Sequence, residues 1–448
     1  MSTTLPAPLA DQAIAARLGR YGRFGVHLGL GRIRVLLAAL GNPQEQVPII
    51  HVGGTNGKGS VCAYLSAILA QAGYKVGRYT SPHLVSWCER ICINDRPIAP
   101  TDLETSLTQV EAAIDPQADS PTQFEVLTAA AWVYFAQEKV DVAVIEVGLG
   151  GRLDATNVCD RPLVSIITSL SREHWQRLGP TLADIAREKA GILKAGCPAV
   201  VGPLPAEAQA VVAERIQALN CPVIYPEPAQ PLGQDQAEYP SEHGSLCFRL
   251  PLQGQYQYTN VALAITALQT LQQQGWAISD RDMAEGIAAA RWPGRLQWLT
   301  WHDPHNHAHT LLVDGAHNPA AALVLRQYVD TLPGSSRACS WVMGMLDTKD
   351  HGDILAALLR PGDYLHLLPV PEHQSAAPET LAAIAQHVCP DLNGVHCHGS
   401  LETALAEAVQ HPNRTVLCGS LYLVGHCFAT QAGRLKPLTA LASRECQP

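Results

Sequence analysis

The chain has 448 residues, of which 47% are hydrophobic and 16% are charged. This length exceeds one ordinary hydrophobic core and predicts two or three domains, while the apolar content excludes a globally disordered protein. The 40 acidic and 31 basic residues give a formal net charge of -9. Because no basic stripe offsets this charge, we expect no nucleic acid as a partner.

The cysteines and the hydropathy pattern indicate the compartment. The 13 cysteines are scattered without a CxxC pair, which is untypical of a secreted disulfide framework and favours a reducing environment. Residues 1–24 lack the continuous apolar segment of a signal peptide, and no later stretch reaches the roughly 18 apolar residues of a membrane span. We therefore expect an untargeted, cytoplasmic protein without a membrane partner.

The first part of the chain alternates apolar, β-branched runs with segments of helical periodicity. This alternation predicts an α/β fold with a doubly wound, mostly parallel sheet. Strands are expected at residues 48–52, 140–147, 163–168 and 199–201, and helices at 61–73, 124–137 and 182–190. The segment 225–244 is rich in Pro, Gln and Glu and lacks periodicity, so it predicts a surface excursion and not a core element.

A second domain is expected after residues 291–295, where RWPGR places Pro and Gly between two patterned regions. Short apolar runs recur beyond this linker, each beside an Ala/Leu-rich helical segment. They predict a second, smaller α/β domain. Its strands are expected at residues 310–313, 340–343, 364–368 and 416–418.

The segment 53–60 reads GGTNGKGS and stands between an expected strand and an expected helix. Backbone N–H groups at a helix N-terminus and a nearby lysine are the usual means of binding phosphates. The segment departs from the standard P-loop pattern because Gly59 follows Lys58 and the hydroxyl comes one residue later, at Ser60. A glycine-rich turn without a ligand is the alternative, and the lysine argues against it.

Polar side chains are also expected where neighbouring strands end. Glu146 closes one buried strand, His174 follows the next strand along the chain, and Ser81 in TSPHL can add a hydroxyl. Ligands bind at the carboxyl ends of strands in an open parallel sheet, and a carboxylate there suits Mg2+. Taken singly, Glu146 and His174 also fit structural roles.

Other candidates read as ordinary structure on their residues alone. Lys189, in REKAGILK, fits a solvated lysine near the end of an Ala-rich helix. The histidines at 302–309 match no structural zinc spacing and are expected in a hairpin loop. His396 and His398, with a cysteine between them, are interpreted as ordinary strand and loop sequence.

Seven segments in chain order resemble the folylpolyglutamate synthase/dihydrofolate synthase family of the Mur ligase superfamily: GTNGKGS, TSPHL, EVGLGGRLDATN, EKAGI, PGR, DGAHNP and GSLYLVG. The resemblance implies a P-loop, ATP-binding, Mur-ligase-like domain, placed at residues 1–296, and a Rossmann-like α/β domain at 297–448. It also implies an ATP-dependent ligase. ATP would phosphorylate the carboxylate of dihydropteroate or of a folate, and the amine of L-glutamate would attack the acyl phosphate.

The resemblance implies roles for particular residues. The ATP phosphates and nucleotide would be bound by Gly57, Lys58, Gly59, Ser60, Asn260, Arg295 and Asp314. Mg2+ would be held by Ser81, Glu146 and His174. The pteroate would be bound by Thr122, Phe124, Arg152, Leu153 and Asp154. Catalytic roles are implied for Lys58, Lys189 and His317, with Lys189 carbamylated and supporting a second Mg2+.

One departure and several alternatives remain open. Glu173 and His174 stand where the family usually has an Asp-His pair, and the loop at residues 23–32 is assigned to the folate pocket by resemblance alone. The family implies a monomer acting on ATP, L-glutamate and dihydropteroate or reduced folates. The alternatives are folate glutamylation only, another Mur-type amino-acid ligase, and a P-loop regulatory switch that lacks a pterin pocket.

Overall fold

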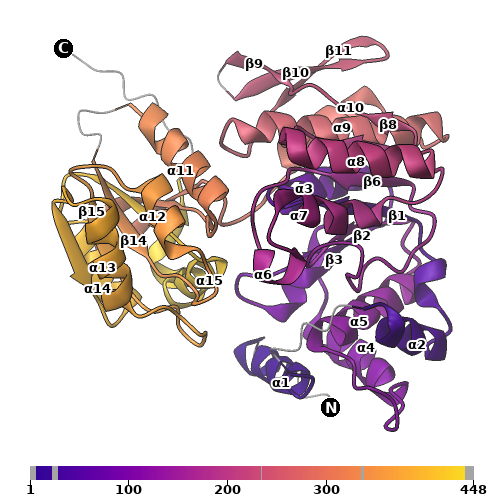
Figure 1. The fold of residues 1–448 in the computed structure, drawn as a ribbon, viewed down its shortest axis with the longest axis horizontal. Helices are drawn as coiled ribbons and strands as arrows, with labels where there is room; N and C mark the ends of the chain where they lie inside the picture. Colours follow the sequence, from indigo (N-terminus) through magenta and orange to yellow (C-terminus); the bar gives the residue numbers. More distant parts are fainter. Residues whose placement is uncertain (1–6, 23–28, 234, 334–337, 439–448) are drawn as a thin grey trace. The chain divides into compact units, whose positions relative to one another are not determined.

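The computed structural model describes residues 7–22, 29–233, 235–333 and 338–438. Most of the expected folate loop, residues 23–28, lies outside this description. The chain forms two compact units, Met1–Trp292 and Pro293–Pro448 (Figure 1). The division falls within the segment 291–295, where the sequence predicts a linker. None of the described helices is long and apolar enough to cross a membrane.

The first unit is built on an eight-stranded sheet with the order β4-β3-β2-β5-β1-β6-β7-β8. The six strands from β2 to β8 in this order pair in parallel, and β3 and β4 add an antiparallel edge. The expected doubly wound, mostly parallel sheet is thereby confirmed. The strands are β1 Ile49–Gly53, β2 Val76–Tyr79, β3 Ile91–Ile93, β4 Arg96–Pro97, β5 Val142–Glu146, β6 Val164–Ile167, β7 Ala199–Val201 and β8 Val223–Ile224.

Helices cover both faces of this sheet. Alternate residues of β1 enter different cores, since Ile50 and Val52 pack with α3, α9 and α10, whereas Ile49 packs with α2, α4 and α5. Burial on both faces explains why β1 reads as a continuous apolar run. The helices are α1 Ala7–Gly19, α2 Gly31–Ala39, α3 Lys58–Gln71, α4 Pro100–Ala112, α5 Gln123–Gln137, α6 Trp175–Leu178, α7 Leu182–Lys189, α8 Ala206–Leu219, α9 Tyr256–Gln273 and α10 Asp280–Ala289.

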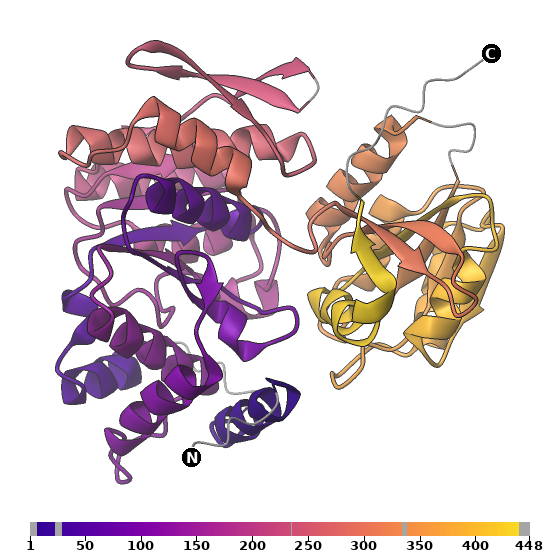
Figure 2. The same ribbon diagram turned by 180° about the vertical axis from the view of Figure 1, so that it is seen from behind.

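The prediction of a surface excursion at residues 225–244 is wrong for its second half. The strands β9 Gln230–Gly233, β10 Gln236–Ser241 and β11 Gly244–Arg249 form a separate antiparallel sheet, visible beside α9 and α10 in Figures 1 and 2. Ala237 and Tyr239 of β10 are buried in the same core as α9. The sequence signal of β10 is weak because only Ala237 and Tyr239 mark its inward face and Pro240 lies within the strand.

The second unit contains a seven-stranded sheet with the order β16-β15-β14-β17-β13-β12-β18. The five strands from β16 to β13 pair in parallel, and β12 and β18 are antiparallel. The strands are β12 Gln297–His302, β13 Ala308–Val313, β14 Cys339–Met343, β15 Tyr364–Leu367, β16 Gly394–Cys397, β17 Arg414–Cys418 and β18 Leu435–Pro437. The helices are α11 Pro319–Thr331, α12 His351–Leu358, α13 Pro378–Val388, α14 Leu401–Ala408 and α15 Leu421–Thr430.

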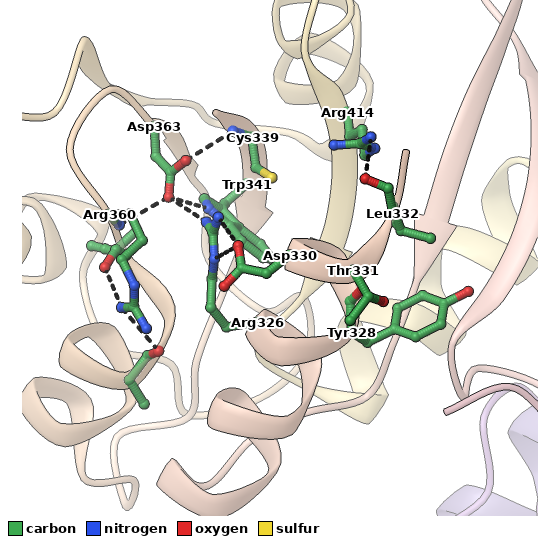
Figure 3. A network of polar contacts seen from close by, with 12 residues as sticks. Arg326, Tyr328, Asp330, Thr331, Leu332, Cys339, Trp341, Arg360, Asp363 and Arg414 are labelled. Atoms are coloured by element: carbon green, nitrogen blue, oxygen red, sulfur yellow. Dashed lines mark hydrogen bonds and ion pairs between the residues drawn. The ribbon is translucent and has the colours of Figure 1, made fainter. Parts of the chain in front are cut away.

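A buried ion pair holds the middle of the second unit together (Figure 3). The Asp363 carboxylate, just before β15, is fully buried and lies 3.0 Å from Nη1 of Arg326 on α11. It also accepts hydrogen bonds from the Trp341 indole at 2.9 Å and from the backbone N–H groups of Cys339 and Arg360 at 2.8 and 3.0 Å. One carboxylate thus joins α11, β14 and the start of β15.

We expect Asp363→Ala to lower the free energy of unfolding by about 3–5 kcal/mol, because Arg326 loses its buried partner and retains the half-exposed Asp330, and the buried donors of Cys339 and Trp341 lose their acceptor. Glu402→Ala is the matched control, since it removes an exposed ion pair with Arg434 and should cost about 0–1 kcal/mol. Urea unfolding followed by tryptophan fluorescence measures both. Equal losses in the two variants would contradict the structural role given to Asp363.

Candidate active site

The loop between β1 and α3 has the geometry of a phosphate-binding site. It ends at Gly57, which precedes the first residue of α3, Lys58, and has a φ of 87°. This left-handed conformation favours glycine, and a Cβ on Gly57 would lie 2.5 Å from Oδ1 of Asn260. The N-terminus of the 14-residue helix α3 carries partial positive charge toward the loop. The arrangement suits an anion such as a phosphate.

The first part of this loop is fixed to the end of β6. The backbone N–H of Thr55 donates to the carbonyl of Ser169 at 2.7 Å, and the N–H of Asn56 donates to the Ser169 hydroxyl at 3.2 Å. The Thr168 hydroxyl donates in turn to the carbonyl of Asn56 at 2.6 Å. These two N–H groups are therefore occupied within the protein, and phosphate binding by the residues from Gly57 onward stays a prediction.

Two lysines contact adjacent carbonyls of the loop. Nζ of Lys58 donates to the carbonyl of Thr55 at 2.9 Å, and Nζ of Lys189 donates to the carbonyl of Gly54 at 2.8 Å. Lys189 ends α7 and is 5% exposed. Burial and then the charge of Lys58 lower the pKa of Lys189 to about 7, against the opposing effects of Glu173 and Asp154. The interpretation of Lys189 as a solvated helical lysine is therefore wrong.

The three expected metal ligands follow β2, β5 and β6 at one edge of the sheet. Glu146 is the last residue of β5 and is 5% exposed, and its Oε2 accepts a hydrogen bond from the backbone N–H of Ser81 at 3.0 Å. His174 follows β6 with a φ of 53°, and its Nε2 lies 3.9 Å from Oε1 of Glu173. Ser81 and Glu146 are thus joined by a hydrogen bond. His174 follows β6, which is separated from β5 by β1 in the sheet.

The glycine-rich loop after Glu146 is organised by Asp154. Its two carboxylate oxygens accept hydrogen bonds from the backbone N–H of Leu149 at 2.8 Å and from the N–H and hydroxyl of Thr156 at 3.0 and 2.5 Å. The Thr156 hydroxyl also contacts Nε2 of His51 in β1 at 2.9 Å. Burial raises the pKa of Asp154. Asp154 therefore sets the loop conformation, and direct substrate contact by this residue stays a prediction.

Phe124 lies against the same loop. A Cβ on Gly148 would overlap the Phe124 ring, so glycine is needed for this approach. The ring centroid is 6.0 Å from that of Tyr79 at the end of β2. Among the residues that the structure describes, Tyr79 is thus the aromatic neighbour of Phe124, and the glycine-rich loop lies against the same ring, a setting that suits a flat ligand ring.

The other expected pteroate residues have structural partners. Thr122 caps α5, because its hydroxyl accepts from the N–H of Glu125 at 3.2 Å and Glu125 accepts from the N–H of Thr122 at 2.7 Å. Arg152 pairs with Glu188 at 2.8 Å, and Leu153 is half-buried. These contacts position the chain around the loop, and substrate binding by the three residues stays a prediction.

Asn260 connects α9 to the first turn of α3. Its Nδ2 donates to Oε1 of Gln257 at 3.1 Å, and Gln257 donates to the hydroxyl of Ser60 at 3.2 Å. Ser60 and Gln257 are both buried. The sequence did not single out Gln257, which accepts from Asn260 and donates to the Ser60 hydroxyl, leaving the hydrogen of that hydroxyl for another acceptor.

The expected nucleotide residues of the second unit gather after β13. The buried Asp314 carboxylate accepts from the backbone N–H groups of Leu296 and Ala316, both at 2.8 Å, and burial raises the pKa of Asp314. Nδ1 of His317 lies 2.7 Å from the carbonyl of Gly315. A Cβ on Gly315 would meet the Arg295 guanidinium. Arg295, Asp314 and His317 therefore form one local group.

The histidines at residues 302–309 lie in the β12–β13 hairpin, as expected. Asp303 accepts from the N–H of His305 at 2.9 Å, from Nδ1 of His307 at 3.1 Å and from Nε2 of His309 at 3.4 Å. Asp303 and these three histidines therefore stabilise the turn of the hairpin. The turn precedes β13, whereas Asp314 and His317 follow that strand.

Family and relative comparisons cover most of the chain. Residues 52–268 match the Mur ligase middle domain, and residues 297–430 match the dihydrofolate synthetase C-terminal domain. The dihydrofolate synthase/folylpolyglutamate synthase of Bacillus subtilis is 38% identical over 359 residues, 77% of this chain and 82% of that protein. The dihydrofolate synthetase of Saccharomyces cerevisiae is 35% identical over 433 residues, 92% of this chain and 99% of that protein.

Solved structures show the same fold. The structure of Escherichia coli FolC in complex with DHPP and ADP has a TM-score of 0.82 and 32% identity, and covers 95% of this chain and 98% of that one. The Mycobacterium tuberculosis folylpolyglutamate synthase complexed with ADP and AMPPCP has a TM-score of 0.83 and 30% identity, covering 94% and 98%. Both of these structures contain bound ADP, and this chain shares their fold.

The lowered pKa of Lys189 makes stability depend on pH. Below about pH 7 the lysine is charged in both the folded and the unfolded state. Burying the charged lysine then costs at most on the order of 5 kcal/mol, the free energy that corresponds to lowering its pKa from 10.5 to about 7. This cost decreases as pH rises from 7 to 10.5, where the lysine is neutral in both states. We expect Lys189→Met to raise the free energy of unfolding most below pH 7 and least near pH 10.5.

Urea unfolding in carbon-dioxide-free buffer at several pH values measures this difference. Lys75→Met controls for the loss of a lysine, because it removes an exposed ammonium group paired with Glu138 at 2.7 Å. A stability difference between Lys189→Met and the parent protein that is constant across the pH range would contradict the lowered pKa.

Proposed function

Because the chain belongs to the folylpolyglutamate synthase/dihydrofolate synthase family, we propose that it is an ATP-dependent ligase that adds L-glutamate to dihydropteroate and to reduced folates. The observation that carries the proposal is the loop from Gly54 to Gly57, with Lys58 and Lys189 donating to its carbonyls and Glu146 at the neighbouring strand end. Cations around a helix N-terminus suit a nucleoside triphosphate.

The reaction follows from the family membership in two steps. A carboxylate oxygen of the pteroate or folate attacks the γ-phosphorus of ATP, the bond to the β-phosphate oxygen breaks, and ADP leaves. The deprotonated amine of L-glutamate then attacks the acyl carbon, and inorganic phosphate leaves as the amide forms. In both steps the enzyme contributes mainly positioning and charge stabilisation.

We assign the phosphate contacts to Gly57, Lys58, Gly59 and Ser60. The hydrogen bonds of Thr55 and Asn56 to Ser169 keep the loop in one conformation before ATP arrives, so little reorganisation is needed. Lys58 then exchanges the Thr55 carbonyl for a phosphate oxygen. Asn260, Arg295 and Asp314 are proposed to bind the remaining nucleotide.

The donors at the ends of β2, β5 and β6 fit Mg2+. Glu146 is a buried carboxylate, which needs compensating positive charge, and Ser81 and His174 add a hydroxyl and an imidazole. We propose that these three residues hold Mg2+ together with phosphate oxygens. When bound, the ion would neutralise phosphate charge and orient the γ-phosphoryl group.

Lys189 is suited to carbamylation, which we propose as its state during turnover. Carbon dioxide reacts only with a neutral amine, and a pKa of about 7 leaves much of Lys189 neutral under ordinary conditions. The nitrogen forms a bond to the carbon of carbon dioxide and loses a proton, which replaces a buried cation with a carboxylate. This exchange removes the repulsion from Lys58 and provides oxygen donors for a second Mg2+.

The remaining assignments rest on local chemistry. Phe124 is proposed to stack on the pterin or the aminobenzoyl ring, with Thr122, Arg152, Leu153 and Asp154 around it. Nδ1 of His317 donates to the carbonyl of Gly315, so Nε2 of the neutral ring carries the lone pair and can accept a proton near the reaction centre. We also propose that the protein is a cytoplasmic monomer. The described cysteines form no disulfide bonds, which agrees with a reducing compartment.

We expect carbamylation to be visible by 13C NMR. Protein equilibrated with 13C-labelled bicarbonate should show a carbamate carbon resonance that is absent from Lys189→Ala and present in Lys75→Ala, because only Lys189 is buried next to a second lysine. A resonance that survives in Lys189→Ala would assign the carbamate to another amine.

ADP release tests the function directly. With ATP, Mg2+ and L-glutamate present, we expect turnover only when dihydropteroate or tetrahydrofolate is added, with the glutamylated product identified by mass. Turnover with both acceptors establishes both activities, and turnover with one assigns the narrower activity. ATP hydrolysis that is independent of acceptor and glutamate would contradict the ligase and support a P-loop switch.

A matched pair of variants connects this activity to the phosphate loop. Lys58→Met should lower kcat/KM by roughly 100- to 1000-fold, since it removes a charge that stabilises the transferring phosphoryl group. Lys75→Met, which removes an exposed lysine from the same unit, should leave kcat/KM unchanged.

A further inference from the structure

A cluster of imidazoles and one carboxylate lies on β15, β16 and α14 of the second unit. Its members come from segments that are distant in the chain and that the parallel sheet brings together. They are His366, His396, His398, Glu407 and His411. The expected strand and loop backbone at 396–398 is present, but its two histidine side chains join a cluster that the sequence interpretation did not recognise.

Three side chains of the cluster present ligand atoms to one point. Nδ1 of His366 lies 3.2 Å from Nε2 of His398, and Nε2 of His398 lies 3.8 Å from Oε2 of Glu407. One ligand atom from each residue falls within 4.8 Å of the others. In a tetrahedral zinc site with bonds of about 2.0–2.1 Å, ligand atoms stand about 3.3 Å apart. The separations therefore need little adjustment to admit an ion.

The histidines are held in place and poorly hydrated. His366 is fully buried, and His398 has a side chain only 7% exposed. The imidazoles of His398, His396 and His411 lie around the buried ring of His366, whose Nδ1 faces Nε2 of His398. The other ring nitrogen of His366, Nε2, is not the proposed ligand atom and has no hydrogen-bond partner among the described residues.

Surrounding groups orient these ligands. Nδ1 of His396 lies 2.9 Å from Oε1 of Glu407, and the His396 ring stacks on His366 at 5.2 Å with an angle of 13° between planes. His411 stacks on Tyr364 at 3.7 Å. Helix α14, which carries Glu407, packs against β14 and β15. Such outer contacts fix the rings and carboxylate of metal sites.

We propose that His366, His398 and Glu407 bind a divalent transition-metal ion, with zinc as the best match, in a site separate from the nucleotide residues. Two imidazoles and a carboxylate are a zinc ligand set and leave a fourth position for water, whereas Mg2+ prefers oxygen ligands. In the sheet, β14 and β17 separate β15 from β13, which precedes Asp314 and His317.

Equilibrium metal binding to the untagged full-length chain tests this site. The protein is first treated with a chelator, and Mg2+ is kept in excess to occupy oxygen-rich sites. We expect one tightly bound Zn2+ per chain beyond any weaker binding, and a Co2+ complex with the intense visible bands of tetrahedral coordination. Neither readout uses enzymatic activity, so the outcome is independent of the proposed ligase.

Variants locate the bound ion. Glu407→Gln removes a carboxylate that is 43% exposed, keeps the side-chain shape and should weaken Zn2+ binding at least 10-fold, and His398→Gln should abolish the tight site. The double variant His305→Ala, His307→Ala removes exposed imidazoles of the hairpin and should retain it. Circular dichroism of metal-free Glu407→Gln confirms that the variant folds.

Two results would overturn the proposal. Zn2+ binding that is equally tight in Glu407→Gln and His398→Gln would show that this cluster is a structural hydrogen-bonded network. Loss of tight Zn2+ binding in the hairpin double variant would show that the ion binds at residues 302–309 instead.

Discussion

The interaction on which the first unit depends is the approach of two lysines to one short loop. Lys58 and Lys189 donate to the carbonyls of Thr55 and Gly54, which are adjacent in the chain, so two ammonium groups face the same few atoms. Without an anion this arrangement is electrostatically unfavourable, and the lowered pKa of Lys189 is one result. A bound triphosphate would relieve the repulsion by adding negative charge, and the proposed carbamylation would relieve it by removing one cation.

The rest of the unit supplies the rigidity that this arrangement needs. The loop is tied to Ser169 after β6, and the neighbouring glycine-rich loop is tied to itself through Asp154 and to β1 through Thr156 and His51. Buried polar groups with complete hydrogen bonding are costly to move. The backbone at the site is therefore held in a fixed position, and under the proposed function only the charge there would change, through a proton, carbon dioxide or the ligand.

The sequence predicted those parts of the fold and site that depend on local pattern. The order of strand, glycine-rich loop and helix is enough to place Lys58, because all three elements are consecutive. The burial of Lys189 could not be predicted from local pattern, because α7 packs against the loop at Gly151 and the ammonium group contacts Gly54, 135 residues earlier in the chain. The same limit hid the cluster around His366, whose partners are 30 to 45 residues away and meet only when β15 pairs with β16.

The second unit shows how a buried charge at the start of a strand can determine which face a histidine of that strand occupies. Asp363 accepts from the N–H of Cys339 and the indole of Trp341, which fixes the start of β15 against β14 in the register Ser340 to Tyr364. Because side chains alternate along a strand, this register decides which face receives His366, two residues beyond Tyr364. A slip of one residue would send His366 to the opposite face. The Arg326–Asp363 pair is therefore part of what assembles the imidazoles, although it contributes no atom to their cluster.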